Sequence, residues 1–237
     1  MSGRPVVFFH VMKCGGSSVR AALAEGVPGG RAGPGVFELD GRAAKAAAGG
    51  TTDDDWQFRD VLLPYVVATA RPAVVLGHFR YRDRHAPLLD EAHLVTVLRD
   101  PVERLLSLYD YRRYQPGVVL PVSASLEDQL ASQRWALEGH RYIDTFGGRD
   151  GLDPTSAEAV EATVENLRRF AVVGSVDRLD AFARDVSALL GTPVEIPRLN
   201  ASPAPADRQV DADVLAQIRA MCAADSQVYE RVVGTTE

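Results

Sequence analysis

The sequence has few cysteines and no long apolar run. Among its 237 residues there are two cysteines, Cys14 and Cys222, too few and too far apart for the framework of a disulfide-rich secreted protein. The N-terminus lacks a signal-peptide pattern, because the apolar run Val6–Phe9 is short and turns polar at once. No stretch reaches the roughly 20 apolar residues of a transmembrane helix. We therefore expect a cytoplasmic protein without an integral membrane segment.

The sequence also lacks a positive net charge and a cluster of metal ligands. Its formal net charge is −6 at pH 7, so no overall positive field is present to hold a nucleic acid. His85, His93 and His140 share no metal-ligand spacing with one another or with a cysteine, and we expect no metal site. An anionic ligand must therefore be held by a local arrangement of donors.

Short apolar runs alternate with helical patterns along most of the chain. β-branched and aromatic residues predict strands at residues 5–10, 73–79, 94–99 and 171–175. Helices are predicted at residues 19–25, 53–70, 100–114, 125–139, 155–170, 178–190 and 209–233. Between them we expect a long connection at residues 26–50, with a short helix through 42–48, and an extended loop at residues 192–207. The alternation predicts one α/β domain over residues 1–237, with three layers (α/β/α) and a parallel central sheet, similar to P-loop nucleotide-binding folds.

A glycine-rich turn follows the first predicted strand and opens the first predicted helix. It comprises Lys13, Cys14, Gly15, Gly16, Ser17 and Ser18. Such a turn offers backbone N–H groups and the positive end of a helix dipole, which suit phosphate or sulfate. Its lysine precedes the glycines, whereas the GxxxxGK[ST] loop of nucleotide triphosphatases places lysine after them. The alternative is an ordinary strand-to-helix turn in which two glycines allow tight packing.

Arg99 ends the third predicted strand, and Ser107 lies two turns into the following helix. The carboxyl edge of a parallel sheet is where ligands bind, and arginine suits bidentate recognition of a phosphate. Both side chains could therefore reach one anion. The alternative is that Arg99 only pairs with Asp100 or Glu103.

The helix after Arg99 has clear sequence limits. Asp100 can cap it, and Pro101 occupies its first position. Its apolar residues fall at helical spacing, so we expect this face to pack on the sheet; they are Val102, Leu105, Leu106 and Tyr109.

Together, the two segments resemble the two signatures with which sulfotransferases bind 3′-phosphoadenosine-5′-phosphosulfate (PAPS). The resemblance is strongest to the group of heparan sulfate 2-O-sulfotransferase and its bacterial relatives, where the signatures commonly run HxPKTGGTS and RDPxERxxSxY. Here residues 10–18 are HVMKCGGSS and residues 99–109 are RDPVERLLSLY. Met12 stands where proline is usual and Cys14 where threonine is usual. The resemblance also covers Gly77 and His78 and, more weakly, residues 173–182.

The resemblance implies a role for each matching residue. It assigns the 5′-phosphosulfate to residues 13–18 and the 3′-phosphate to Arg99 and Ser107. Lys13 would stabilise the charge that grows on the bridging oxygen as the sulfuryl group leaves. Sulfuryl transfer, like phosphoryl transfer, has a loose in-line transition state, so positioning and electrostatics supply most of the catalysis. The product nucleotide would be 3′-phosphoadenosine-5′-phosphate (PAP), and no metal is implied.

His78 ends the second predicted strand. Histidine has a pKa near neutrality and can take a proton from an attacking hydroxyl. The segment GHFRY is similar to the Gly-His segment that carries the catalytic histidine in the 2-O-sulfotransferase group, so we predict that His78 is the general base. The alternative is a structural histidine at a strand end.

Two further segments are candidates for ligand contact. Residues 198–202 resemble a late loop that closes over the nucleotide in sulfotransferases, which makes Asn200 and Ser202 predicted nucleotide-binding residues; the alternative is a plain surface loop. Arg80, Arg82 and Arg84 could attract an anionic acceptor, but a solvated basic loop is the favoured interpretation.

The sequence thus predicts an enzyme, a PAPS-dependent O-sulfotransferase acting on a hydroxyl of a small molecule, lipid or glycan. The acceptor is expected between His78, residues 26–50 and residues 123–151. Two alternatives stay open. A P-loop phosphotransferase or kinase would need a lysine after the glycines and a carboxylate for magnesium, and a catalytically silent nucleotide-binding protein would lack a working base.

Overall fold

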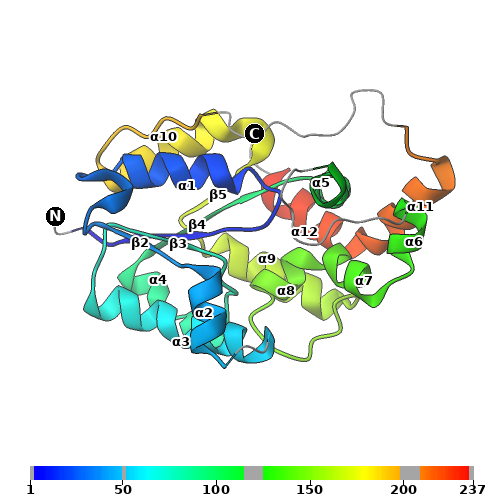
Figure 1. The fold of residues 1–237 in the computed structure, drawn as a ribbon, viewed down its shortest axis with the longest axis horizontal. Coiled ribbons are helices and arrows are strands. Elements are labelled where there is room, and N and C mark those ends of the chain that lie inside the picture. The colour runs from blue at the N-terminus through cyan, green and yellow to red at the C-terminus, as the bar shows by residue number, and fades with distance from the viewer. Residues whose placement is uncertain (1–2, 50–51, 115–124, 198–208, 235–237) are drawn as a thin grey trace.

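The computed structural model describes residues 3–49, 52–114, 125–197 and 209–234 (Figure 1). Within them a five-stranded sheet has the order β2-β3-β1-β4-β5, and every neighbouring pair is parallel. The strands are β1 (Val6–Phe9), β2 (Val36–Glu38), β3 (Val74–Gly77), β4 (His93–Leu98) and β5 (Val172–Ser175). The predicted α/β class with a parallel central sheet is confirmed. The edge strand β2, inside the expected long connection, was not predicted.

The helices surround this sheet and mostly follow the predicted pattern. Those of the described residues are α1 (Gly16–Glu25), α2 (Gly41–Ala47), α3 (Thr52–Thr69), α4 (Leu88–Glu91), α5 (Pro101–Tyr114), α6 (Leu126–Leu130), α7 (Gln133–Gly139), α8 (Arg141–Phe146), α9 (Ala157–Arg168), α10 (Leu179–Leu190), α11 (Ala212–Met221) and α12 (Ala223–Val233). Three short 3₁₀ turns join them, at Gly30–Ala32, Asp83–His85 and Val176–Arg178. The helix predicted over residues 125–139 is two helices, α6 and α7, and the predicted C-terminal helix divides at Cys222 into α11 and α12.

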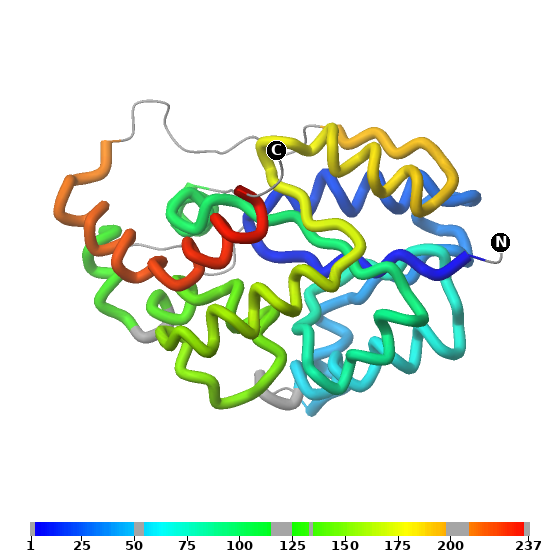
Figure 2. The backbone as a smooth tube through the Cα atoms, turned by 180° about the vertical axis from the view of Figure 1, so that it is seen from behind, coloured from blue at the N-terminus to red at the C-terminus, as the bar shows by residue number. Residues whose placement is uncertain are grey.

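Two apolar cores lie on opposite faces of the sheet and make the three layers. Alternate residues of β1 serve both: Val6 and Phe8 face the core under α1 and α10, while Val7 and Phe9 face the core with α3, α4, α8, α9 and α12. All four are at most 1% exposed, as expected for a strand of a parallel sheet covered on both faces. From behind, α12 lies against α8 and α9 (Figure 2).

The apolar face of α5 packs differently from the prediction. Leu105, Leu106 and Tyr109 belong to a third cluster, with Trp135 of α7 and Ile218 of α11, rather than to either sheet core. The expectation that this face packs on the sheet is therefore wrong. The helical spacing identified the buried face correctly, but spacing contains no information about which element covers that face.

The strand order determines where a ligand can bind. The chain leaves β1 toward β2 on one side of the sheet and leaves β4 toward β5 on the other side. Because the connections diverge between these adjacent strands, a crevice forms at their carboxyl ends. The register also places β1 and β3 in step, with Phe9 beside Gly77, so the next residues, His10 and His78, are neighbours. Within the described residues, no helix is long and apolar enough to cross a membrane.

Candidate functional site

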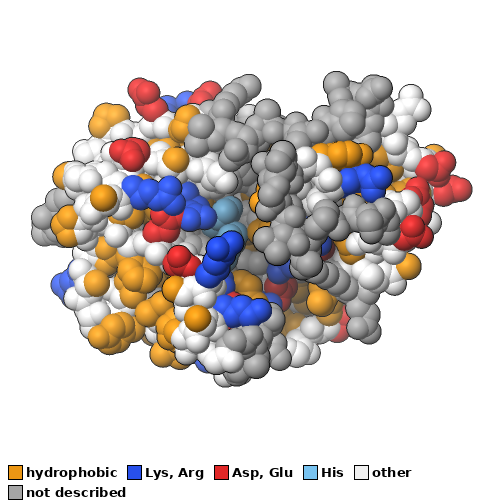
Figure 3. Space-filling model, viewed as in Figure 1, with side chains coloured by type: hydrophobic (Ala, Val, Ile, Leu, Met, Phe, Trp, Pro, Cys, Tyr) orange, Lys and Arg blue, Asp and Glu red, His pale blue; other side chains and the backbone are white. Residues whose placement is uncertain are grey.

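A cavity of about 720 Å³ lies at the carboxyl edge of the sheet, in the crevice between β1 and β4. It brings together most of the residues predicted for the site: Lys13, Gly15, Gly16, Ser17, Ser18, His78, Arg99 and Ser107. On the molecular surface, histidine atoms are recessed in the middle of one face, with Lys and Arg side chains beside them (Figure 3). Asn200 and Ser202 lie outside the described residues. The roles of all these residues stay predictions.

The glycine-rich turn presents the start of α1 to this cavity. Gly15 has a φ of 69°, in the left-handed region that favours glycine, and α1 begins at the next residue. The helix has no side-chain cap and no acidic residue in its first turn. No carboxylate of α1 therefore neutralises the positive end of the helix dipole at the cavity. Such a helix start suits an anion.

Gly16 is needed for a close approach. A Cβ at this position would lie 1.8 Å from Nε2 of His10, so the imidazole ring of His10 packs directly on the first turn of α1. The two glycines of the turn thus serve different purposes, one for backbone conformation and one for space.

Lys13 reaches the cavity from a strained backbone. Its φ is 68°, one of two positive values at non-glycine residues in the described chain, and this conformation costs about 1–2 kcal/mol. Its ammonium lies over the ring of Tyr111, with Nζ 4.1 Å from the ring centroid. Burial and, next, the positive charge of Arg99 lower the pKa of Lys13. Because Lys13 and Arg99 are close enough to repel one another, an anion bound between them would be stabilised by both charges.

Arg99 and Ser107 also line the cavity. The Arg99 guanidinium lies 3.4 Å from the carboxylate of Glu103 in the first turn of α5, which is a long contact for an ion pair. Arg99 also borders the cavity. Both sequence interpretations of Arg99 therefore describe part of the geometry. Asp100 caps α5 as predicted, since its Oδ1 accepts from the backbone N–H of Glu103 at 2.9 Å.

His78 is held in one orientation and one tautomer. Its Nδ1 lies 2.7 Å from the backbone oxygen of His10, and its ring stacks on the His10 ring with centroids 4.2 Å apart. A carbonyl oxygen only accepts, so Nδ1 carries the proton and Nε2 keeps its lone pair. Burial, the largest cause, lowers the pKa of His78 to about 4, with Arg20, Arg59 and Arg141 acting in the same direction. His78 is therefore a neutral imidazole at neutral pH, protonated on Nδ1 only.

The basic residues after His78 are mostly paired rather than solvated. Arg82 is 6% exposed and lies near Asp60 and Asp150, while Arg80 pairs with Asp144 at 3.0 Å. Arg84, the exposed member, contacts Asp60 at 2.7 Å. The interpretation of this segment as a solvated basic loop is wrong, because its arginines bind carboxylates of α3, α8 and the turn after α8.

Cys14 turns away from the cavity. Its side chain is 1% exposed, and Sγ lies 3.7 Å from the hydroxyl of Tyr142. Burial raises the pKa of the Cys14 thiol to about 11, so the thiol stays protonated. Cys14 is the one predicted nucleotide-binding residue of the turn that does not line the cavity.

Several cavity residues were not predicted. Tyr111 follows Ser107 by one helical turn, and that spacing could have identified it. Val176, Asp177, Leu179 and Asp180 follow β5, so the carboxyl end of the fourth predicted strand was the available signal. Ile196 had no signal. In the described part of the chain, no group of three or more His, Cys, Asp or Glu side chains is placed to hold a metal ion.

Comparison with known proteins adds no argument about the site. No family model matches the sequence, and a search of the curated proteins found no match. Among solved structures, the chain is similar to mouse sulfotransferase SULT7A1 complexed with PAP, with a TM-score of 0.44 and 11% identity. The match covers 94% of this chain and 66% of the mouse chain, so this chain spans just under two thirds of that protein. At this level of similarity the site must be interpreted from its own residues.

Proposed function

We propose that this protein is a PAPS-dependent O-sulfotransferase. The observation that carries the proposal is the cavity at the β1–β4 crevice, which combines two groups of cationic or hydrogen-bond-donating residues with a neutral histidine. One group is Lys13 with the start of α1, and the other is Arg99 with Ser107. A nucleotide with phosphates at both its 5′ and 3′ positions needs two such groups.

The residues present fit this donor in charge and in hydrogen bonding. The turn offers backbone N–H groups, the Ser17 and Ser18 hydroxyls and the Lys13 ammonium to the phosphosulfate, while Arg99 and Ser107 are available to the 3′-phosphate. The protein as a whole has a net charge of −6, so this local concentration of donors is what would attract an anion.

The chemistry needs one proton acceptor and one stabilised leaving oxygen. PAPS supplies the sulfuryl group: a bond forms between the acceptor oxygen and sulfur while the bond from sulfur to the 5′-phosphate oxygen breaks. His78 Nε2 takes the hydroxyl proton, and the His10 carbonyl stabilises the resulting imidazolium through Nδ1–H. Lys13 stabilises the charge on the departing phosphate oxygen. These roles belong to the proposal.

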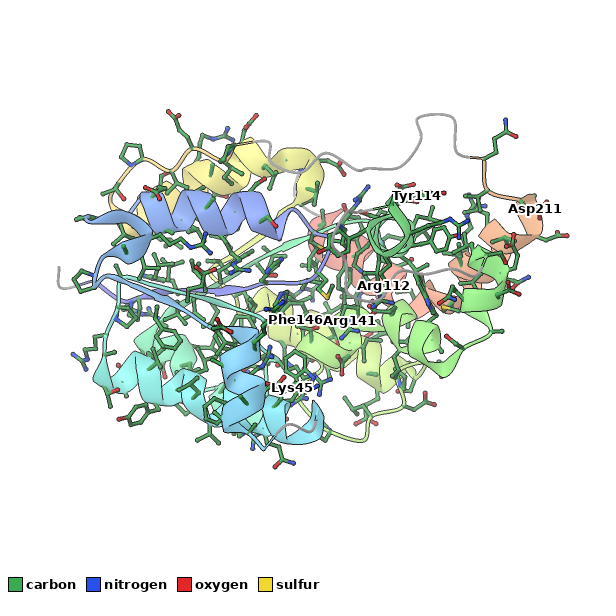
Figure 4. All side chains as sticks on the ribbon, viewed as in Figure 1. Lys45, Arg112, Tyr114, Arg141, Phe146 and Asp211 are labelled. Atoms are coloured by element: carbon green, nitrogen blue, oxygen red, sulfur yellow. The ribbon has the colours of Figure 1, made fainter. Side chains whose placement is uncertain are left out.

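The acceptor is the least defined part of the proposal. His78 is flanked by Arg59, whose Nη1 donates to the His78 carbonyl at 3.2 Å, and by the α8 residues around Arg141. Figure 4 labels Arg141 and Phe146, the two ends of α8, near the middle of the molecule. We propose that a hydroxyl-bearing small molecule, lipid or glycan approaches His78 from the side of Arg59 and α8.

The test is transfer from PAPS labelled with ³⁵S to a panel of hydroxyl-bearing acceptors, with PAP binding measured separately by calorimetry. Lys13→Ala and His78→Ala should each reduce turnover at least 100-fold, as expected for loss of an electrostatic or general-base group. Arg99→Ala should mainly weaken PAP binding. Lys45→Ala and His93→Ala are matched controls, because Lys45 is exposed on α2 and His93 begins β4 at the opposite edge of the sheet.

The outcomes separate three classes of protein. Binding of PAP together with labelled product supports the sulfotransferase, whereas binding of PAP without transfer to any acceptor supports a silent nucleotide-binding protein. Phosphoryl transfer from a nucleoside triphosphate with no affinity for PAP would support a phosphotransferase. Full activity of Lys13→Ala or His78→Ala would remove that residue from the mechanism.

A further inference from the structure

The hydroxyl of Tyr142 lies in the interior between the two segments proposed to bind the donor. Tyr142 is the second residue of α8 and is 0% exposed. Its oxygen accepts from the backbone N–H of Arg99 at 2.9 Å, and its O–H donates to the backbone carbonyl of the same residue. The third neighbour of this oxygen is Sγ of Cys14, at 3.7 Å.

These contacts use the full hydrogen-bonding capacity of the phenol. A tyrosine hydroxyl has one donor and two acceptor positions. The proton is committed to the Arg99 carbonyl, so toward Cys14 the phenol oxygen can only accept; the single thiol proton is shared between this oxygen and the Met12 carbonyl, which lies 3.8 Å from Sγ. One hydroxyl thus joins the turn of residues 13–18 to Arg99, the residue that follows β4.

Tyr142 is itself fixed by the last helix. Asp225 of α12, also 0% exposed, accepts from the backbone N–H of Tyr142 at 2.8 Å and from that of Ile143 at 3.2 Å. These bonds satisfy N–H groups at the start of α8 that have no partner within their own helix. The buried cation Arg104 of α5 reaches the same region, where it contacts Glu138. The phenol therefore has little freedom to move away from Arg99.

We infer that Tyr142 is a positioning residue of the donor site, which holds the backbone of Arg99 so that its guanidinium faces the 3′-phosphate. The inference rests on the proposed function, since it names the part of PAPS that this contact serves. A guanidinium on a long side chain binds a phosphate more tightly when its backbone is already fixed, because less conformational entropy is then lost on binding. Arg99 directly follows a strand, so its N–H and carbonyl need partners, and Tyr142 supplies both.

The test uses Tyr142→Phe, which removes one oxygen and leaves the ring. Tyr81→Phe is the matched control, because Tyr81 is also 0% exposed and its hydroxyl has no hydrogen-bond partner among the described residues. Calorimetry measures the affinity of each protein for PAP and for adenosine 5′-phosphate, which differ only in the 3′-phosphate. Tyr142→Phe should weaken PAP binding about tenfold, the size expected when buried backbone groups lose a partner, with less than a twofold change for adenosine 5′-phosphate. Tyr81→Phe should change neither.

The result distinguishes this inference from the proposed function. If the wild-type protein binds neither PAP nor adenosine 5′-phosphate, the proposed function fails. If it binds PAP and Tyr142→Phe binds PAP equally well, or if the variant weakens both nucleotides equally, the positioning role is wrong. Should Tyr142→Phe not fold, hydrogen exchange in the wild type decides: the Arg99 amide exchanges as slowly as the amides of β4 if Tyr142 holds it, and fast exchange overturns the inference.

Discussion

At the scale of single residues, the site depends on how His78 is surrounded. The His10 carbonyl fixes its tautomer, the His10 ring stacks on it, and its Nε2 is left as the basic atom. A free imidazole in solution would be half-protonated near pH 6.5, but burial and three arginines hold this one neutral. The environment that keeps the Nε2 lone pair available also makes His78 a weak base. An anion bound nearby would raise the pKa of His78 and make it a stronger base.

The titration of His78 can be measured directly. In the free protein, the proton NMR signal of its imidazole, assigned with His78→Gln, should titrate with a midpoint near pH 4, because the pKa is lowered to about 4. Saturation with PAP should move the midpoint upward, since added negative charge favours the protonated imidazole. A midpoint near 6.5 in the free protein would show that His78 is solvated rather than buried.

At the scale of elements, the first turn of α1 and the end of β1 share one small space. Gly16 begins the helix where a side chain would collide with His10. Alanine normally favours a helix over glycine by up to about 1 kcal/mol, so selection of glycine here reflects packing and not helix propensity. The position of the glycine-rich turn is therefore linked to the His10 ring, which stacks on His78.

This link predicts non-additive stabilities. Gly16→Ala alone should lower the free energy of unfolding by about 1–3 kcal/mol, the usual cost of overpacking, as measured by urea denaturation. In a His10→Ala background, the same substitution should be neutral or stabilising, because the ring that it strikes is gone. Equal losses in the two backgrounds would show that Gly16 and His10 do not compete for this space.

At the scale of the whole molecule, segments from most of the chain meet at the cavity. It is bordered by residues following β1, β3, β4 and β5, and its interior contact through Tyr142 depends on α8 and α12. Ligand binding should therefore stabilise the whole fold. The expectation of a single domain over residues 1–237 stays a prediction.

Calorimetric unfolding tests that expectation. PAP at 100 times its dissociation constant should stabilise the protein by about 2.7 kcal/mol. For a domain of this size, that corresponds to a rise of roughly 5–10 °C in the midpoint of one cooperative transition. Two transitions, of which only one moves with PAP, would show that the chain is divided into separate folding units.

The sequence was sufficient for four of the five strands and for part of the cavity wall, but not for the interior. Short apolar runs predicted four of the strands and missed β2, because its three residues are only half-buried and stand in a segment rich in Gly and Ala. The turn, Arg99 and His78 were predicted because each follows a strand in a recognisable local pattern, and Ser107 because it lies two helical turns after Arg99 in the same pattern. Tyr142 was missed because its partners are 43 and 128 residues away, beyond any local pattern.

The dependence of α8 on Asp225 also sets an order of events during synthesis. The glycine-rich turn leaves the ribosome early, yet the helix that fixes Tyr142 against Arg99 is capped by a carboxylate translated about two hundred residues later. At roughly 5–20 residues per second, the nascent chain spends about 10 to 40 seconds with the turn of residues 13–18 already made and the contact between Tyr142 and Arg99 not yet secured. Under the proposed function, a nascent chain would gain full affinity for a doubly phosphorylated nucleotide only once α12 has docked.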